Sequence, residues 1–423
     1  MELKSQKIPV LALLVCTTSG LFYCLEYLIQ VSPSVMFDQM ITAYHTSPIG
    51  IALMGSFFFY AYAAMQVPVG IFTDRYGTRF PVAIAMLFCS IAVLYWSQAN
   101  NITQAICARV VIGGTSAFAY ITALTLIKQR LSKNYFTTAI SSLQCLGAIG
   151  AMCGQMPLLT LSNKIGWQGM LKVLSACLII IAGLLFLLQF RSTSRDQKDQ
   201  SIKLDSRSIC IIDVIKLGKF WQIFFIGAIC WLPAGAFAAL WGVPFLQKQF
   251  SINSLESSQI MMFFWLGLSF SPVIGIIHDK LKNTTILVVS LFSIATISML
   301  IILYTDVKIL TITGLFLLGV SCANQSLSMV LVKNCFQDKI FARVASIINM
   351  SAIIGAGLVQ YAIGLIITHL EPGMTNTQQY QLKTYQIAIS LIPCCAGIMV
   401  IILMMNYIKK IQVKNLISDI HPM

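Results

Sequence analysis

The feature that most constrains this chain is a series of long apolar segments, each close to the roughly 20 residues that an α-helix needs to cross a lipid bilayer. Roughly twelve such segments follow one another, separated by short polar breaks. Hydrophobic residues fill 57% of the 423 positions and charged residues only 10%, a balance that excludes a soluble domain of this length. The sequence therefore predicts an all-α integral membrane protein. The segments lie near residues 8–34, 49–72, 80–98, 103–127, 137–161, 168–190, 221–246, 257–277, 284–304, 308–332, 342–369 and 385–408.

The longest polar stretch separates the sixth apolar segment from the seventh. It spans residues 191–219, and we interpret it as a linker between an N-terminal half, 1–190, and a C-terminal half, 220–423, with six helices in each. Lys and Arg concentrate in this linker, near both ends of the chain and in alternate loops, which is typical of cytoplasmic segments. We therefore expect both termini and the linker in the cytoplasm. Orientation accounts for the formal net charge of +14 without a nucleic-acid partner.

The two predicted halves carry matching residues at one constant spacing of 205 positions. Such a match indicates an internal duplication, and halves of equal orientation place a binding site between them, near the midplane of the bilayer. The matched pairs include Gly70 and Gly275, Asp74 and Asp279, Arg75 and Lys280, Gly114 and Gly319, and Gly150 and Gly355.

A charged motif follows the second apolar segment, in the stretch "GIFTDRYGTR". A pure orientation signal needs only positive charge, so it does not explain the acidic residue at position 74. The motif consists of Gly70, Asp74, Arg75, Gly77 and Arg79. It resembles the signature of the major facilitator superfamily, G-x-x-x-D-R-x-G-x-R between helices 2 and 3. A second motif of that family, R-x-x-x-G in helix 4, is matched by Arg109 and Gly113.

This resemblance implies a fold of twelve transmembrane helices in two six-helix halves, in which helices 1, 4, 7 and 10 line a central cavity. It also implies that the motif contacts the other half near the start of helix 11, where the partial positive charge of a helix N-terminus favours an acidic side chain. We expect the motif, with Asp279, Lys280 and Arg343, to act in conformational switching and not in solute binding.

Two ionisable residues lie well inside apolar segments, Glu26 in the first and Arg109 in the fourth. At about 1.5 Å of rise per residue, both reach the same third of the bilayer, so we expect them to meet. One interpretation is a buried salt bridge that neutralises both charges. The other makes Glu26 a proton-coupling site, because removal from water favours the neutral carboxyl, with Arg109 tuning it or binding a substrate carboxylate. The sequence leaves both open.

Polar and aromatic residues on the same four helices are further candidates for the cavity. Adjacent amides in an apolar segment are costly in hydrocarbon, which indicates a wet cavity or a helix partner. The candidates are Tyr23, Tyr27 and Gln30 in helix 1, Ser116 and Tyr120 in helix 4, Trp231 and Trp241 in helix 7, and Asn324, Gln325 and Ser328 in helix 10.

These features predict a transporter and not an enzyme. No nucleotide-binding loop of the G-x-x-x-x-G-K-[ST] type is present, which argues against an ATP-driven pump and favours secondary transport. We expect a monomer in a bacterial inner membrane, with no cofactor or metal, that carries an amino acid, a dipeptide or an organic monoanion, in symport with protons. Alternatives are a uniporter of a neutral solute, an antiporter of sugar phosphates or organic anions, and a non-transporting receptor or scaffold.

Overall fold

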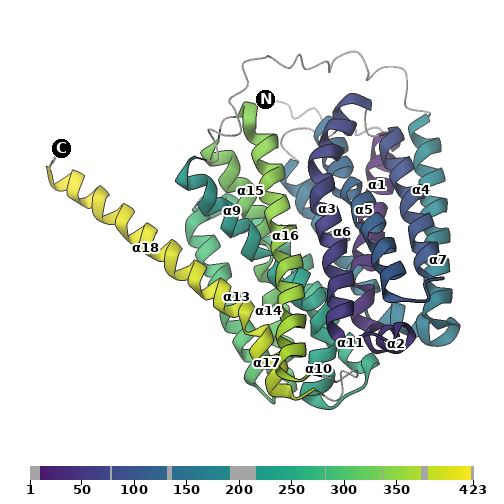
Figure 1. The fold of residues 1–423 in the computed structure, drawn as a ribbon. Coiled ribbons are helices and arrows are strands. Elements are labelled where there is room, and N and C mark those ends of the chain that lie inside the picture. The colour runs from purple at the N-terminus through teal and green to yellow at the C-terminus, as the bar shows by residue number, and fades with distance from the viewer. Residues whose placement is uncertain are drawn as a thin grey trace.

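The computed structural model describes residues 10–76, 79–130, 136–190, 216–281, 283–336, 338–372 and 380–420. Every regular element in these ranges is a helix, as the apolar segments predict (Figure 1). The helices of the N-terminal half are α1 (Val10–Val35), α2 (Phe37–Tyr44), α3 (Pro48–Tyr76), α4 (Arg79–Trp96), α5 (Ile102–Arg130), α6 (Phe136–Cys153) and α7 (Met156–Phe190). Those of the C-terminal half are α9 (Gly218–Cys230), the π-helix η2 (Pro233–Trp241), α10 (Gly242–Phe250), α11 (Ser254–Ser269), α12 (Ser271–Leu281), α13 (Thr284–Tyr304), α14 (Lys308–Ser321), α15 (Asn324–Cys335), α16 (Asp338–Leu370), α17 (Leu382–Ile389) and α18 (Leu391–Ile420).

Many of the described helices, alone or in consecutive runs, are long and apolar enough to cross a membrane. By length and composition, nine spans in the described residues qualify, and Pro81–Trp96 is a shorter apolar helix. One span, Ser142–Leu187, contains two helical arms that meet at Gly166, whose positive φ of 76° suits a residue without a side chain. Large apolar side chains such as Ile180 and Leu187 stay exposed on the outside, as a surface that faces lipid requires.

Several membrane-crossing segments consist of two or three consecutive helices, and most of these interruptions lie at a proline. A proline has no N–H to donate, so the carbonyl four residues earlier loses its helical partner. At Pro272 the chain replaces that donor locally, because the Ser271 hydroxyl donates to the Leu268 carbonyl at 2.5 Å. The prolines at these interruptions are Pro157 (α6 to α7), Pro233 (α9 to η2), Pro272 (α11 to α12) and Pro393 (α17 to α18).

Glycines at corresponding places allow a very close helix contact in each half. A Cβ atom at Gly113 of α5 would lie 2.1 Å from the Phe58 carbonyl oxygen of α3, and one at Gly319 of α14 would lie 1.9 Å from the Phe264 oxygen of α11. Only glycine permits such an approach of two backbones. By the contact that it makes, Gly319 of the C-terminal half corresponds to Gly113 of the N-terminal half. The constant spacing of 205 residues instead relates Gly319 to Gly114, one position away.

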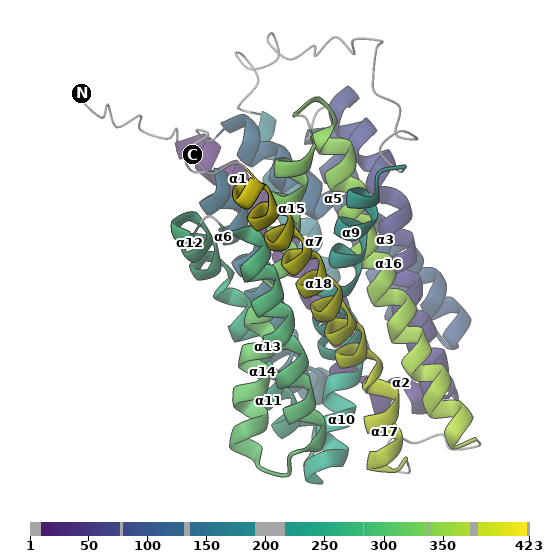
Figure 2. The ribbon, with the colours of Figure 1, turned by 90° about the vertical axis from the view of Figure 1, so that its left-hand side faces the viewer.

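The two halves pack against each other along several helices. Helix α3 lies beside α16, α6 lies beside α11 and α12, and α1 contacts η2 (Figures 1 and 2). The short helices α2, α10 and α17 gather at the lower end of the bundle in Figure 1, which we call the α2 end. The last turns of α18 project away from the bundle (Figure 1).

Candidate functional site

A cavity lined by residues of both halves lies between them. Its N-terminal wall comes from α1, α3, α5 and α6, and its C-terminal wall from α15, α16 and the junction of α9 with η2. The lining residues are Tyr23, Glu26, Tyr27, Gln30, Phe58, Phe59, Tyr62, Tyr120, Gln144, Trp231, Gln325, Asn349 and Ile353.

Glu26 places a carboxyl group in this cavity. The residue is 2% exposed, and its Oε2 is buried with no hydrogen-bond partner among the described residues. A buried polar atom without a partner costs about 1–3 kcal/mol, and more if it is charged. The Oε2 acceptor of Glu26 is therefore unsatisfied by the described residues in this conformation.

Arg109 does not form the expected ion pair with Glu26 in the described part of the chain. Its guanidinium donates instead to the backbone oxygens of Ile29 at 3.0 Å and Gln30 at 3.4 Å, both in α1. The same group lies 4.5 Å from the ring centre of Phe58 and 5.2 Å from that of Trp96. It is 1% exposed and outside the residues that line the cavity. A role in binding a substrate carboxylate therefore has no support in this geometry.

Pro33 explains why the Arg109 side chain points to the backbone. Without an N–H, Pro33 leaves the Ile29 carbonyl of α1 without its helical donor. Arg109 supplies one donor to this oxygen, and the Ser32 hydroxyl supplies another at 2.9 Å. The arginine thus satisfies the interrupted turn of α1 next to Glu26.

A group of aromatic side chains surrounds Glu26. The Tyr23 hydroxyl donates to Gln144 Oε1 at 3.1 Å and lies 3.0 Å from the Tyr27 hydroxyl. The Tyr23 and Tyr120 rings are 5.6 Å apart between centres, and the Tyr27 ring is 6.3 Å from Trp231 of the other half. Aromatic contacts therefore join the two halves across the cavity.

Amide groups form the opposite wall. Gln325 Nε2 donates to Asn349 Oδ1 at 3.0 Å, and the Cys230 thiol donates to Gln325 Oε1 at 2.9 Å. Asn349 and Gln144 lie outside helices 1, 4, 7 and 10, to which the family resemblance assigns the cavity, so they are absent from the predicted lining residues. The repeat contained the signal, since the spacing of 205 residues relates Gln144 to Asn349.

Several predicted cavity residues lie elsewhere. Trp241 donates from Nε1 to the Gln360 carbonyl at 3.0 Å and packs against Phe37, with 5.4 Å between ring centres. Ser328 donates to a carbonyl of its own helix, and Ser116 is buried in α5 outside the lining. Adjacent side chains on a helix point about 100° apart, so Gln325 lines the central cavity while Asn324 faces away from it.

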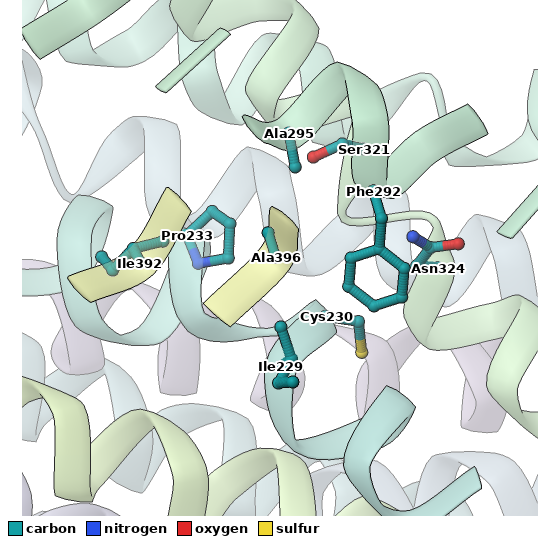
Figure 3. Close-up of a pocket in the computed structure, with 9 residues that line it drawn as sticks. All are labelled: Ile229, Cys230, Pro233, Phe292, Ala295, Ser321, Asn324, Ile392 and Ala396. Carbon is teal, nitrogen blue, oxygen red and sulfur yellow. The ribbon is translucent and has the colours of Figure 1, made fainter. Parts of the chain in front are cut away.

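Asn324 lines a second, smaller cavity, which lies within the C-terminal half (Figure 3). Its Nδ2 donates to the Val288 carbonyl at 3.3 Å, while its buried Oδ1 has no partner in the described residues. Cys230 and Ser321 are also in its lining, with apolar side chains around them (Figure 3).

The two halves are in tight contact at the α2 end. The Ser56 hydroxyl of α3 donates to the Gly357 carbonyl of α16 at 2.8 Å, and a Cβ atom at Gly364 would lie 2.8 Å from that of Ala52. Towards the opposite end, Tyr120, Gln325 and Asn349 are partly exposed. The cavity is therefore closed at the α2 end in this conformation.

The switching motif lies largely outside the described side chains. The backbone is helical at Gly70, Asp74, Arg75, Arg79, Asp279 and Arg343, while Gly77 lies outside the described residues. Lys280 is exposed in the last turn of α12. The role of the motif stays a prediction.

Together, the fold and the cavity define a multi-pass helical bundle whose two halves enclose a polar and aromatic chamber, the architecture of a solute carrier. Residues 19–360 match the sequence profile of the Major Facilitator Superfamily, so the chain belongs to this family. It is a multi-pass membrane transporter of a small-molecule solute and not an enzyme.

Individual relatives are distant. An uncharacterized MFS-type transporter of Bacillus subtilis (strain 168), YybF, is 23% identical over 281 residues, which cover 65% of this chain and 66% of that protein. The chain thus spans about two thirds of the length of this curated relative.

Two kinds of solved structure show the same fold. A bacterial homolog of the human lysosomal transporter Spinster, in an inward-facing and unoccupied conformation, is 13% identical, with a TM-score of 0.73 over 93% of this chain and 96% of that one. The nucleoside transporter NupG is 16% identical, with a TM-score of 0.68 over 93% of this chain and 99% of that one. At such identities the likeness concerns the fold alone.

Proposed function

We propose that this protein is a secondary transporter that carries a small organic solute through the central cavity by alternating access. The observation that carries the proposal is the chamber between the halves, closed at the α2 end, into which Glu26 places a carboxyl group without a partner. A chamber bounded by two movable halves can be exposed to either side of a membrane in turn.

Proton coupling through Glu26 is the second part of the proposal. A single buried carboxyl without a fixed ion pair is suited to take up and release a proton as its access to water changes. Amino acids and dipeptides stay candidates, because their ammonium group is able to bind a carboxylate. The anionic alternatives lack support, since the described lining contains no Lys, Arg or His.

Three further parts of the proposal rest on the sequence: the boundary of the halves, the location of the protein and the role of the charged motif. The linker 191–219 separates the two halves, and the protein is a monomer in a bacterial inner membrane. The motif around Asp74 lies at the cytoplasmic contact between the halves, which opens and closes during transport. In this scheme the contacts of Ser56 and Gly364 close the external side.

Counterflow in proteoliposomes tests the proposal. Vesicles are preloaded with one member of a panel of amino acids, dipeptides, monoamines, organic acids and sugars, and uptake of the labelled compound is measured. We expect accelerated exchange for at least one class relative to empty vesicles. Binding without accelerated exchange of any member is the behaviour of a receptor or scaffold and would contradict the proposal.

A further inference from the structure

The charged side chains that line the central cavity are of one sign. Glu26 is the acidic side chain of its lining, and no basic side chain accompanies it among the described residues. We propose that the cavity selects solutes that carry an ammonium group on an apolar body, with the ammonium against Glu26. This inference rests on the proposed function and names the substrate class of that same site.

The first support is the free acceptor capacity of Glu26. Its Oε2 is buried and has no partner within the described chain. Arg109, the nearest candidate partner, uses its guanidinium on the carbonyls of Ile29 and Gln30 and on two aromatic rings. A solute ammonium would supply the missing donor in a charge-assisted hydrogen bond, which is stronger than a neutral one.

The second support is the set of aromatic rings around the carboxyl group. Tyr27 and Trp231 approach each other edge to face across the two halves, with an angle of 75° between their planes. Tyr23 and Tyr120 are neighbours on the N-terminal wall. Rings that surround a cation attract it through their negative faces, and quaternary or primary ammonium groups are recognised in this way.

The same arrangement disfavours other solutes. A carboxylate or phosphate would face the Glu26 carboxyl and the negative faces of the rings, with Arg109 held outside the lining. A neutral solute would leave the Glu26 acceptor without a charged partner. The apolar body of an amine would lie against Phe58, Phe59 and Ile353, which complete the walls.

Three compounds with one body and different charges test the inference. These are 2-phenylethylammonium, 2-phenylethanol and 3-phenylpropanoate, titrated by calorimetry into the purified full-length protein at mildly alkaline pH. We expect the ammonium compound to bind about 10- to 100-fold more tightly than the alcohol, with the carboxylate weakest. Glu26→Gln should bring the ammonium compound to within about threefold of the alcohol. Glu26→Asp should retain the preference.

A matched control separates local from general electrostatics. Glu256 is exposed and lies outside the cavity lining, with its Oε1 2.5 Å from Lys308 Nζ. Glu256→Gln should therefore leave the preference for the ammonium compound unchanged. The order of the three compounds on the unmodified chain is decisive even if a variant fails to fold. Equal affinities, tighter binding of the carboxylate, or no binding of the ammonium compound would overturn the inference.

The outcome is distinguishable from failure of the proposed function. Ammonium preference without counterflow of 2-phenylethylammonium supports the binding class and contradicts the carrier proposal. Counterflow of the alcohol or the carboxylate without an ammonium preference supports the carrier and overturns the binding class.

Discussion

Replacing Glu26 with glutamine is expected to reduce solute accumulation driven by a pH gradient to the level of vesicles without protein. The amide has nearly the same shape as the carboxyl group but binds no proton in the physiological pH range. The pH gradient can therefore no longer drive transport through protonation of this side chain. The measurement is uptake into proteoliposomes with an imposed pH difference, using whichever panel solute the unmodified protein accumulates.

Two controls separate loss of coupling from loss of folding. Counterflow of the same solute by Glu26→Gln at equal pH and saturating concentration should continue, because this exchange needs no proton. The thermal unfolding midpoint should be unchanged or higher, since a neutral amide is less costly to bury than a carboxyl group without a partner. Accumulation at the unmodified rate would remove Glu26 from the coupling mechanism.

Arg109→Met is expected to lower the free energy of unfolding by about 2–4 kcal/mol. Methionine fills much of the space between Phe58 and Trp96 but donates no hydrogen bonds. The Ile29 carbonyl would keep only the donor from Ser32 among its described side-chain partners. The measurement is denaturant unfolding in mixed micelles, followed by the helical circular dichroism signal.

A second substitution tests the cause of this effect. Pro33→Ala restores a backbone N–H that can donate to the Ile29 carbonyl, so Arg109 becomes less necessary. The free energy of unfolding of the double variant Pro33→Ala, Arg109→Met should exceed the value expected from adding the two single effects by about 1 kcal/mol. Strictly additive effects would show that Arg109 does not act through the interrupted turn of α1.

Sequence reasoning could locate the helices and the depth of the charged residues, because both depend on position along an apolar segment. The positions of Glu26 and Arg109 in their apolar segments predict that they lie at the same depth. They do not predict the direction in which the arginine side chain points. That direction depends on the carbonyl that Pro33 frees, which a reading of charges alone does not include. The result is a carboxyl group that lines the cavity without a direct ion pair to Arg109.

The interruptions of the helices were also beyond the hydropathy pattern. The residues of the π-helix Pro233–Trp241, and those between the end of α14 and the start of α15, give no polar signal in the sequence. These interruptions nevertheless change which side chains face the cavity. Trp231 and Gln325 reach it, whereas Trp241 and Asn324 do not. Gln144 and Asn349 were accessible to sequence reasoning through the repeat, because the internal spacing relates them.

The central claim is that the cavity is exposed alternately to the two sides of the membrane by movement of the two halves. A disulfide between Ala52→Cys and Gly364→Cys tests it, because the Cβ atoms would start 2.8 Å apart, so a shift of about 1 Å would bring them within disulfide range. The matched control is Ser90→Cys with Ser175→Cys, whose hydroxyl oxygens are 2.8 Å apart within the N-terminal half.

The readout is labelling of Asn349→Cys by a membrane-impermeant maleimide applied to either side of vesicles, in a protein whose 13 native cysteines are replaced. Oxidation of the Ala52–Gly364 pair should abolish labelling from the α2 end, preserve it from the opposite end, and be reversed by reduction. The control pair should change neither. Unchanged labelling from the α2 end in the crosslinked protein would contradict alternating access through this cavity.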